Sequence, residues 1–201
     1  MKRIAIFASG GGSNALKFLQ YFEDVADVEI ALIVTNKSTA GVLSHAAAYD
    51  ISTLVLSRPY FYDSSCILEV LHAEKIDMIV LAGFLWLVPG YLVAAYPQHI
   101  VNIHPALLPL YGGKGMYGKH VHKAVKAAGD AVTGMTVHYV NEQYDDGGHI
   151  YQAKCQLSET DTAEDIASKV LALEHRYYAP VVHSILVPGA DHGIPLESHK
   201  I

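Results

Sequence analysis

Residues 4–14 read IAIFASGGGSN, an apolar run of strand length that ends in a glycine-rich turn and leads into a segment with helical spacing. Similar apolar runs recur at residues 30–34, 53–56 and 78–82, with segments of helical spacing between them. Strands that are apolar on both faces and alternate with helices are typical of a parallel sheet covered on both sides. We therefore expect a Rossmann-like α/β domain with a mostly parallel central sheet and helices on both faces.

The second half of the chain has a different pattern. Residues 134–140 and 150–155 are two strand-like runs close in sequence, which favours an antiparallel C-terminal strand pair. A final helix is expected from Thr162, because Thr162 and Asp165 have the spacing of a capping box. Pro180 is expected to kink or end this helix. Residues 187–201 are polar and rich in glycine and proline, so we expect a tail that lies on the surface.

Composition limits the class of protein. The 201 residues are 51% hydrophobic and 17% charged with a net charge of −6, which fits one domain over residues 1–201 and excludes a disordered chain. Acidic residues outnumber basic ones, so the protein lacks the excess positive charge that would hold an anionic partner. Neither nucleic acid nor a membrane surface is therefore expected. Cys66 and Cys155 form no CxxC motif, which suits a reducing cytoplasm.

The segment 78–98 carries no charged side chain and is nearly long enough to span a bilayer. Gly83, Pro89 and Gly90 interrupt it, and these residues are typical of turns. We therefore predict a buried strand, a turn and a short helix here, and no membrane span.

The SGGGSN turn at residues 9–14 is a candidate anion site. Glycines allow close approach of the backbone, and the N–H groups of a helix N-terminus attract a phosphate or a carboxylate. The turn matches neither GxGxxG nor GxxxxGK[ST], so it specifies neither a dinucleotide nor a nucleoside triphosphate. The alternative is a plain strand-to-helix turn in which Ser13 or Asn14 caps the helix.

The segment NIHPALLP at residues 102–109 places an amide and an imidazole on one side of an extended strand, at Asn102 and His104. A buried, hydrogen-bonded histidine without catalytic function is the alternative interpretation. The segment YDDGGH at residues 144–149 is an acidic turn, and an ordinary Asp-Gly hairpin turn would explain it equally well. A carboxylate beside His104 would favour the protonated imidazole and so create a general acid.

Histidine is frequent, with 12 in the sequence, and this raises the question of a metal site. His120 and His122 would point apart on a helix, and no HExxH motif accompanies the pair Glu174 and His175. We therefore expect no metal ion.

Five motifs together resemble the phosphoribosylglycinamide formyltransferases, the folate-dependent enzymes of purine biosynthesis. They are SGGGSN, LAGFLWLVP at 81–89, NIHPALLP, YDDGG at 144–148 and LEHRYYAPVV at 173–182. The resemblance extends from the first strand to about Leu186. It implies transfer of a formyl group from 10-formyltetrahydrofolate to the amine of the glycinamide ribonucleotide, with small-molecule substrates and no metal.

The resemblance also implies roles for single residues. The phosphate would bind to Gly12, Ser13 and Asn14 in an N-terminal half at about 1–100, and Glu174 would bind the glycinamide ribonucleotide. In a folate and catalytic half at about 101–186, Asn102 would bind the formyl oxygen, His104 would donate a proton, and Asp145 would keep His104 protonated. The folate pocket would be lined by Leu85, Trp86, Leu87, Val88, Asn102, Asn141, Glu142, Gln143, Tyr144 and Asp145.

The sequence departs from the family pattern at two places. Trp86 stands where many relatives have arginine, so we expect an altered affinity for folate. Residues 112–118, rich in glycine, form a longer loop than usual that is either a lid over substrate or a flexible insertion.

Other activities remain as alternatives. Methionyl-tRNA formylation and formyltetrahydrofolate hydrolysis normally need further domains, whereas formylation of a sugar-nucleotide amine fits the length of this chain. A non-catalytic nucleotide-phosphate binding module would leave Asn102, His104 and Asp145 far apart. We expect a cytoplasmic monomer or homodimer.

Overall fold

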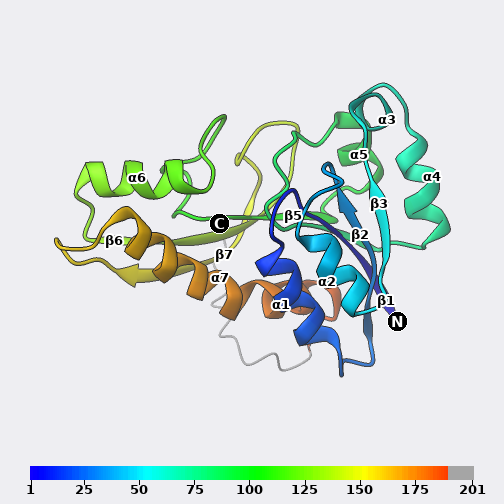
Figure 1. The fold of residues 1–201 in the computed structure, drawn as a ribbon, viewed down its shortest axis with the longest axis horizontal. Helices are drawn as coiled ribbons and strands as arrows, with labels where there is room; N and C mark the ends of the chain where they lie inside the picture. The colour runs from blue at the N-terminus through cyan, green and yellow to red at the C-terminus, as the bar shows by residue number, and fades with distance from the viewer. Residues whose placement is uncertain (190–201) are drawn as a thin grey trace.

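The computed structural model describes residues 1–189, which form a seven-stranded sheet with the order β3-β2-β1-β4-β5-β6-β7 (Figure 1). Strands β1 to β5 pair in parallel, whereas β5 with β6 and β6 with β7 pair antiparallel. The mostly parallel sheet and its antiparallel C-terminal pair are confirmed. The antiparallel pairing of β5 with β6 was not predicted. The strands are β1 (Lys2–Phe7), β2 (Val28–Thr35), β3 (Ser52–Val55), β4 (Met78–Leu81), β5 (Ile100–His104), β6 (Val132–Tyr139) and β7 (His149–Gln156).

Helices cover both faces of the sheet, as predicted. In Figure 1, α1 and α2 lie on one side of strands β1 to β3, and α4 lies on the other side. Strand β1 shows why both faces need cover, because Ile4 and Ile6 join one buried cluster while Ala5 and Phe7 join the other. The helices are α1 (Ser13–Phe22), α2 (Val42–Ala48), α3 (Arg58–Tyr62), α4 (Cys66–Ala73), α5 (Gly90–Ala95), α6 (Lys119–Ala128) and α7 (Ala163–Leu186).

The last helix begins as the sequence predicts but extends further. The Thr162 hydroxyl accepts from the N–H of Asp165 and the Asp165 carboxylate accepts from the N–H of Thr162, which completes the capping box. The prediction that Pro180 could end the helix is wrong, because α7 continues to Leu186. Proline inside a helix costs about 3 kcal/mol. The residues around it, including Tyr178, Val181 and Val182, are buried, and each such burial contributes roughly 1.5–3 kcal/mol.

The uncharged segment 78–98 folds as β4, a loop and the short helix α5. Within residues 1–189 no helix has the length and apolar character needed to cross a membrane. The strand, turn and short helix predicted from Gly83, Pro89 and Gly90 are therefore confirmed.

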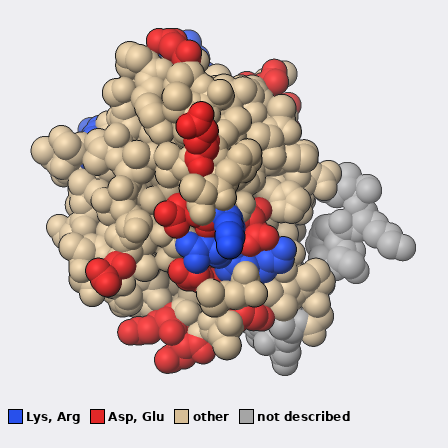
Figure 2. Space-filling view, turned by 90° about the vertical axis from the view of Figure 1, so that its right-hand side faces the viewer, with Lys and Arg blue, Asp and Glu red and all other residues tan. Residues whose placement is uncertain are grey.

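Charged side chains gather around the start of β1, where Figure 2 shows a group of basic residues surrounded by acidic ones. Lys2 contacts Asp77 at 2.9 Å, and Arg3 contacts both Glu29 and Glu74. These cations are neutralised at the amino ends of the strands. The carboxyl ends of the same strands lie at the opposite edge of the sheet, and the cavity described below opens there.

The predicted surface tail begins at residue 187, directly after α7. Its residues 190–201 lie outside the part of the chain that the structure describes.

Candidate active site

A cavity of about 510 Å³ opens at the carboxyl ends of β4 and β5. Strand β1 lies between β2 and β4, so the connections from it run in opposite directions along the sheet. Open α/β sheets bind ligands at such a switch point. The wall of the cavity comes from the loop after β4, the end of β5, the glycine-rich loop 112–118, the turn between β6 and β7, and helix α7.

Asn102 and His104 lie on the same face of β5 and both line the cavity, because alternate residues of a strand share a face. Asn102 Nδ2 lies 3.1 Å from Nε2 of His138, the residue opposite it on β6. One amide N–H is therefore held by His138, and the second stays available for another acceptor. His104 is 3% exposed, and its Nε2 donates to the carbonyl oxygen of Tyr111 at 2.8 Å.

Asp145 reaches the same site from the turn between β6 and β7. Its Oδ2 lies 3.4 Å from His104 Nδ1, and its Oδ1 lies 3.6 Å from His138 Nε2. The backbone N–H of Gly113 donates to Oδ2 at 3.0 Å. Burial works to raise the pKa of Asp145, but the contact with His104 and the N–H of Gly113 hold that pKa well below its usual range. Asp145 is therefore a charged carboxylate at neutral pH.

The two ring nitrogens of His104 each face an acceptor: Nε2 faces a carbonyl oxygen and Nδ1 faces the Asp145 carboxylate. A neutral imidazole carries a proton on one nitrogen only, whereas the imidazolium carries one on both. An imidazole protonated on both nitrogens would satisfy both acceptors, and this is the form that a general acid requires. Asp146, the next carboxylate in the turn, instead accepts from the side-chain amide of Asn141 at 3.2 Å.

The glycine-rich loop is part of the cavity wall. Gly113, Gly115, Met116 and Tyr117 line the cavity, and Gly113 and Gly115 have φ values of +95° and +89° that favour glycine. Because the Gly113 N–H binds Asp145, the position of this loop is coupled to the carboxylate next to His104.

The SGGGSN turn leads directly into α1. The helix begins at Ser13 with Gly12 as its N-cap at φ +76°, and no side chain among residues 1–189 caps it. The alternative that Ser13 or Asn14 caps the helix is therefore wrong. A Cβ on Gly12 would lie 2.7 Å from the Val42 side chain, so only glycine fits there. The uncapped N–H groups of the first turn remain available to an anion.

Glu174 on α7 meets this turn inside the protein. Its Oε2 accepts from Asn14 Nδ2 at 2.7 Å, and both residues line the cavity. Burial raises the pKa of Glu174, although the hydrogen bond from Asn14 and the charge of His104 oppose the rise. A buried carboxylate therefore lies between the anion turn and the group formed by Asn102, His104 and Asp145.

The residues predicted to surround folate are only partly brought together. Two of them, Asn141 and Glu142, lie outside the cavity wall: Asn141 binds Asp146 and the backbone of Gln143, and Glu142 lies against Gly90. Gly12 and Ser13 also lie outside that wall, while Asn14 and Glu174 belong to it. The predicted folate residues that line the cavity are Leu85, Trp86, Leu87, Val88, Asn102, Gln143, Tyr144 and Asp145.

Two buried histidines also line the cavity: His138, which sequence reasoning missed, and His122, which it considered only as a metal ligand. His138 contacts both Asn102 and Asp145. His138 lies on a predicted strand. Only the pairing of β5 with β6, which was not predicted, places it next to Asn102. Burial and the nearby His104 lower the pKa of His122, and its Nδ1 has no hydrogen-bond partner among residues 1–189.

The other histidines do not combine into a metal centre in the described part of the chain. No group of three or more histidine, cysteine, aspartate or glutamate side chains there is arranged to hold an ion.

Gly147 determines the position of Asp145 and leads to a testable prediction. A Cβ at Gly147 would lie 1.8 Å from the carbonyl oxygen of Tyr139, whereas a Cβ at Gly148 would meet only a ring carbon of Tyr139 at 3.9 Å. Gly147→Ala must therefore shift the turn, and we expect a loss of about 1–3 kcal/mol in stability together with most of the activity. Gly148→Ala is the matched control and should resemble the wild type. Thermal unfolding and kcat/KM measure both variants, and equal behaviour of the two would contradict the prediction.

Comparison with known proteins identifies the family. A formyl transferase family model matches residues 2–182. The chain is similar to the chloroplastic phosphoribosylglycinamide formyltransferase of Arabidopsis thaliana, with 40% identity over 99% of this chain and 71% of that protein. The enzyme of the same name from Bacillus subtilis (strain 168) is 36% identical over 92% of this chain and 95% of its own length. A crystal structure of phosphoribosylglycinamide formyltransferase from Anaplasma phagocytophilum superposes with a TM-score of 0.85 and 34% identity, covering 92% of this chain and 86% of that one. The chain therefore belongs to the formyl transferase family, among the phosphoribosylglycinamide formyltransferases.

Proposed function

We propose that this protein transfers the formyl group of 10-formyltetrahydrofolate to the amine of N1-(5-phosphoribosyl)glycinamide, a step of purine biosynthesis. The observation that carries the proposal is the convergence of Asn102, His104 and Asp145 on one cavity beside a free helix N-terminus. Formyl transfer to a phosphorylated amine needs both features. The helix N-terminus would hold the phosphate of the substrate, and the three side chains would stabilise negative charge on oxygen.

The substrate phosphate would bind to the backbone N–H groups of Gly12, Ser13 and Asn14. The partial positive charge of the helix N-terminus favours an anion there. This arrangement explains how a chain with a net charge of −6 can hold a phosphate without a cluster of lysines. The glycinamide end would then extend past Asn14 toward Glu174, whose carboxylate is a suitable acceptor for N–H groups of the substrate.

In the chemical step the amine nitrogen forms a bond to the formyl carbon, and the bond from that carbon to N10 of the folate breaks. The amine loses a proton and N10 gains one. The free N–H of Asn102 and the protonated His104 would stabilise the negative oxygen in between, which is usually the largest single contribution to catalysis. Asp145 would hold His104 in its charged form. Proton transfer from a positioned histidine contributes roughly 10²–10⁴-fold in rate.

The formyl donor is a flat, largely apolar ring system with an anionic tail. A wall made of Leu85, Leu87 and Val88 suits the ring, and Tyr144 lies at its edge. The cavity volume of about 510 Å³ is within the ordinary range for small-molecule sites.

Two alternatives make different predictions. In a non-catalytic phosphate-binding module, His104 and Asp145 have no reason to be close, and their separation of 3.4 Å argues against this alternative. A formyltransferase for a sugar-nucleotide amine would share the catalytic residues and differ in the acceptor.

Competing acceptors test the proposal. The purified protein is given 10-formyltetrahydrofolate with either the glycinamide ribonucleotide or an amino-sugar nucleotide, and tetrahydrofolate formation is followed by absorbance. We expect turnover with the ribonucleotide and little with the sugar nucleotide. The reverse preference would overturn the assignment of the acceptor, and no turnover with either would overturn formyl transfer itself.

Glu174→Gln should separate stability from binding. Because folding raises the pKa of Glu174, its contribution to stability is present at low pH and is lost as the pH rises and the buried group ionises. The glutamine side chain of the variant is neutral throughout, so the two proteins should have similar Tm values near about pH 4, and the variant should become the more stable one toward neutral pH.

The same variant should bind the ribonucleotide about tenfold more weakly, because it lacks the charged acceptor. Thermal unfolding from acidic to neutral pH and the KM for the ribonucleotide measure the two effects. A Tm difference that does not change with pH would contradict the first, and an unchanged KM would contradict the second.

A further inference from the structure

The chemical step of formyl transfer releases one proton that needs an acceptor. The amine nitrogen gives up this proton as it bonds to the formyl carbon, and a neutral imidazole or a free carboxylate is the usual acceptor in an enzyme at neutral pH. Five such side chains line the cavity. They are His104, His122, His138, Asp145 and Glu174.

Two of the three histidines use both ring nitrogens in contacts with the protein. His104 directs Nε2 at a backbone carbonyl oxygen and Nδ1 at the Asp145 carboxylate. His138 directs Nδ1 at the carbonyl oxygen of Tyr139, 2.8 Å away, so this nitrogen carries the proton. Its Nε2 then accepts from the side-chain amide of Asn102 at 3.1 Å. Neither ring therefore offers a free nitrogen to the amine.

The two carboxylates are also engaged. Asp145 faces His104 and accepts from the Gly113 N–H, and its pKa lies well below the usual range, so it binds a further proton poorly. Glu174 accepts from Asn14 Nδ2 at 2.7 Å. Because burial raises the pKa of Glu174, this carboxylate is the one rival that an experiment must exclude.

His122 makes none of these contacts. It lies near the start of α6, is 6% exposed, and its Nδ1 is buried without a hydrogen-bond partner. Its Nε2 makes no hydrogen bond to any of residues 1–189 either. Buried polar atoms in proteins are nearly always hydrogen-bonded. An unpaired, buried imidazole in the wall of a cavity therefore indicates a ligand that supplies the missing partner.

An ordinary core histidine is the alternative interpretation of His122. Val121 and Val125 are fully buried, and they already attach α6 to the hydrophobic core. A leucine in place of His122 would bury apolar surface there without leaving an unpaired nitrogen. Packing alone therefore does not account for an imidazole at this position.

The surroundings of His122 keep its ring uncharged. Burial and the neighbouring His104 both lower the pKa of His122. Lys119 and Lys123 flank it on α6, and this helix carries no acidic side chain. A neutral imidazole has a lone pair on one nitrogen and can accept a proton there.

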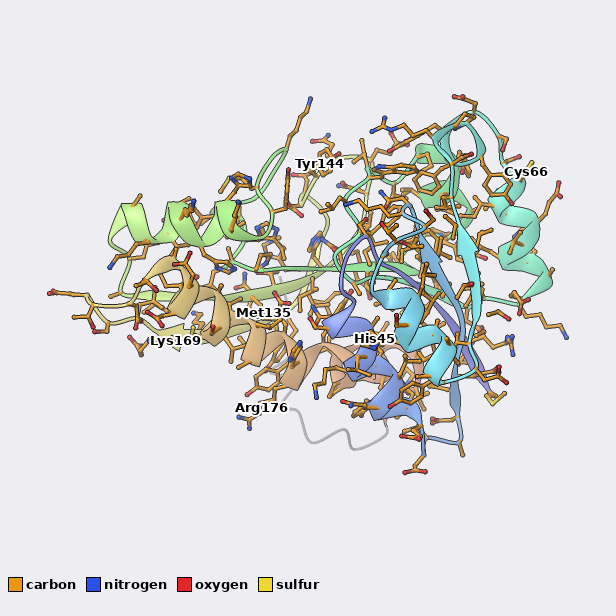
Figure 3. All side chains as sticks on the ribbon, viewed as in Figure 1. His45, Cys66, Met135, Tyr144, Lys169 and Arg176 are labelled. Atoms are coloured by element: carbon orange, nitrogen blue, oxygen red, sulfur yellow. The ribbon has the colours of Figure 1, made fainter. Side chains whose placement is uncertain are left out.

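His122 lies in the enclosed part of the cavity and not at its opening. Figure 3 shows Tyr144, on the turn between β6 and β7, at the edge of the molecule beside the loop that leads into α6. Tyr117 and Tyr144 are 51% and 40% exposed, whereas His104 and His122 are almost fully buried. A proton that leaves the amine in this part of the cavity meets little bulk water.

We propose that His122 accepts the proton of the attacking amine and is thus a catalytic residue alongside His104. The proposal rests on the function proposed above, because it takes the glycinamide amine as the nucleophile. As the amine nitrogen bonds to the formyl carbon, its proton moves to the unprotonated nitrogen of His122. The bond from the formyl carbon to N10 then breaks, its electron pair stays on N10, and His104 supplies the proton there. Return of a proton from His122 to His104 restores both rings.

His122→Gln is the first test. Glutamine keeps a polar side chain of similar length but cannot accept a proton at neutral pH. We expect kcat to fall about a hundredfold with both KM values nearly unchanged, because the lost step is proton transfer and not binding. His120→Gln is the matched control, since His120 lies on the same helix but is exposed and outside the cavity wall. This control should keep the wild-type kcat.

Added imidazole provides the second test. His122→Ala leaves a space in the cavity wall where the ring stood, and free imidazole bound in this space can accept the proton. We expect the kcat of this variant to rise with the imidazole concentration. The rise should be larger at about pH 8 than at about pH 6, because only the neutral form of imidazole accepts a proton.

Glu174→Gln distinguishes the rival acceptor. Loss of the charged carboxylate should raise the KM for the ribonucleotide, and added imidazole should not reverse this change. If instead Glu174→Gln lowered kcat about a hundredfold while His122→Gln stayed near the wild type, Glu174 would be the acceptor and the inference would be wrong.

Three further results would contradict the inference. A wild-type kcat in His122→Gln would show that the amine loses its proton elsewhere. A rise in KM alone would assign His122 to substrate binding, and a low kcat in both His122 variants that imidazole does not restore would assign it a structural role. In each of these cases the wild type is active. Absence of transfer by the wild type itself would instead overturn the proposed function, so the two failures are distinguishable.

Discussion

Replacing His104 with alanine is expected to lower kcat/KM about a thousandfold. The side chain is almost fully buried, with one ring nitrogen on the Tyr111 carbonyl and the other facing the Asp145 carboxylate. Alanine removes the proton donor and leaves the negative oxygen of the reaction with Asn102 alone. Steady-state kinetics with both substrates measure the effect, while the circular dichroism spectrum should stay that of the wild type.

The matched control for this variant is His99→Ala. His99 is exposed and lies just before β5, at the end of the strand opposite His104. Its loss should leave kcat/KM close to the wild-type value. If His104→Ala retained more than about a tenth of the wild-type activity, His104 could not be the acid of the reaction.

Replacing Asp145 with asparagine is expected to cost about a hundredfold or more in kcat. The amide has nearly the same shape and its oxygen can still accept from the Gly113 N–H, but it lacks the negative charge that faces His104. The pKa of Asp145 lies well below its usual range in the folded protein, so this charge is present throughout the neutral range and the loss should not be recovered by raising the pH.

Asp146→Asn tests whether activity needs a negative charge next to His104 or only a negative charge somewhere in the turn. Asp146 lies in the same turn, is exposed and binds only Asn141 among the residues described. We expect it to keep most of the activity. Equal losses in Asp145→Asn and Asp146→Asn would contradict the assignment of Asp145, and a pH profile from about 5 to 9 for each variant measures the difference.

Much of the fold follows from short-range patterns. The buried strands near residues 4, 30 and 78 are read directly from apolar runs, and the start of α7 is read from the spacing of Thr162 and Asp165, because both signals depend on neighbouring residues only. Pro180 shows the limit of such reasoning. Its local preference is to end a helix, but the burial of Tyr178 and Val182 against the sheet outweighs that preference.

The candidate site was only partly predictable for the same reason. Asn102 and His104 share a strand face, so their proximity follows from the sequence. The contacts of His138 and of the Gly113 N–H with Asp145 join segments that are far apart in the chain, and no local pattern indicates them. Conversely, Asn141 and Glu142 belong to the predicted folate segment, but their side chains are engaged within the turn and against Gly90 rather than in the cavity wall.

Transfer of an isotopically labelled formyl group tests the central claim most directly. The protein is incubated with 10-formyltetrahydrofolate labelled at the formyl carbon and with N1-(5-phosphoribosyl)glycinamide, and the products are separated by mass spectrometry. We predict that the label appears on the glycinamide nitrogen in equal amount to the tetrahydrofolate formed, and that His104→Ala loses both products together. Label found as free formate, or no label on the ribonucleotide while the protein is folded, would contradict the account.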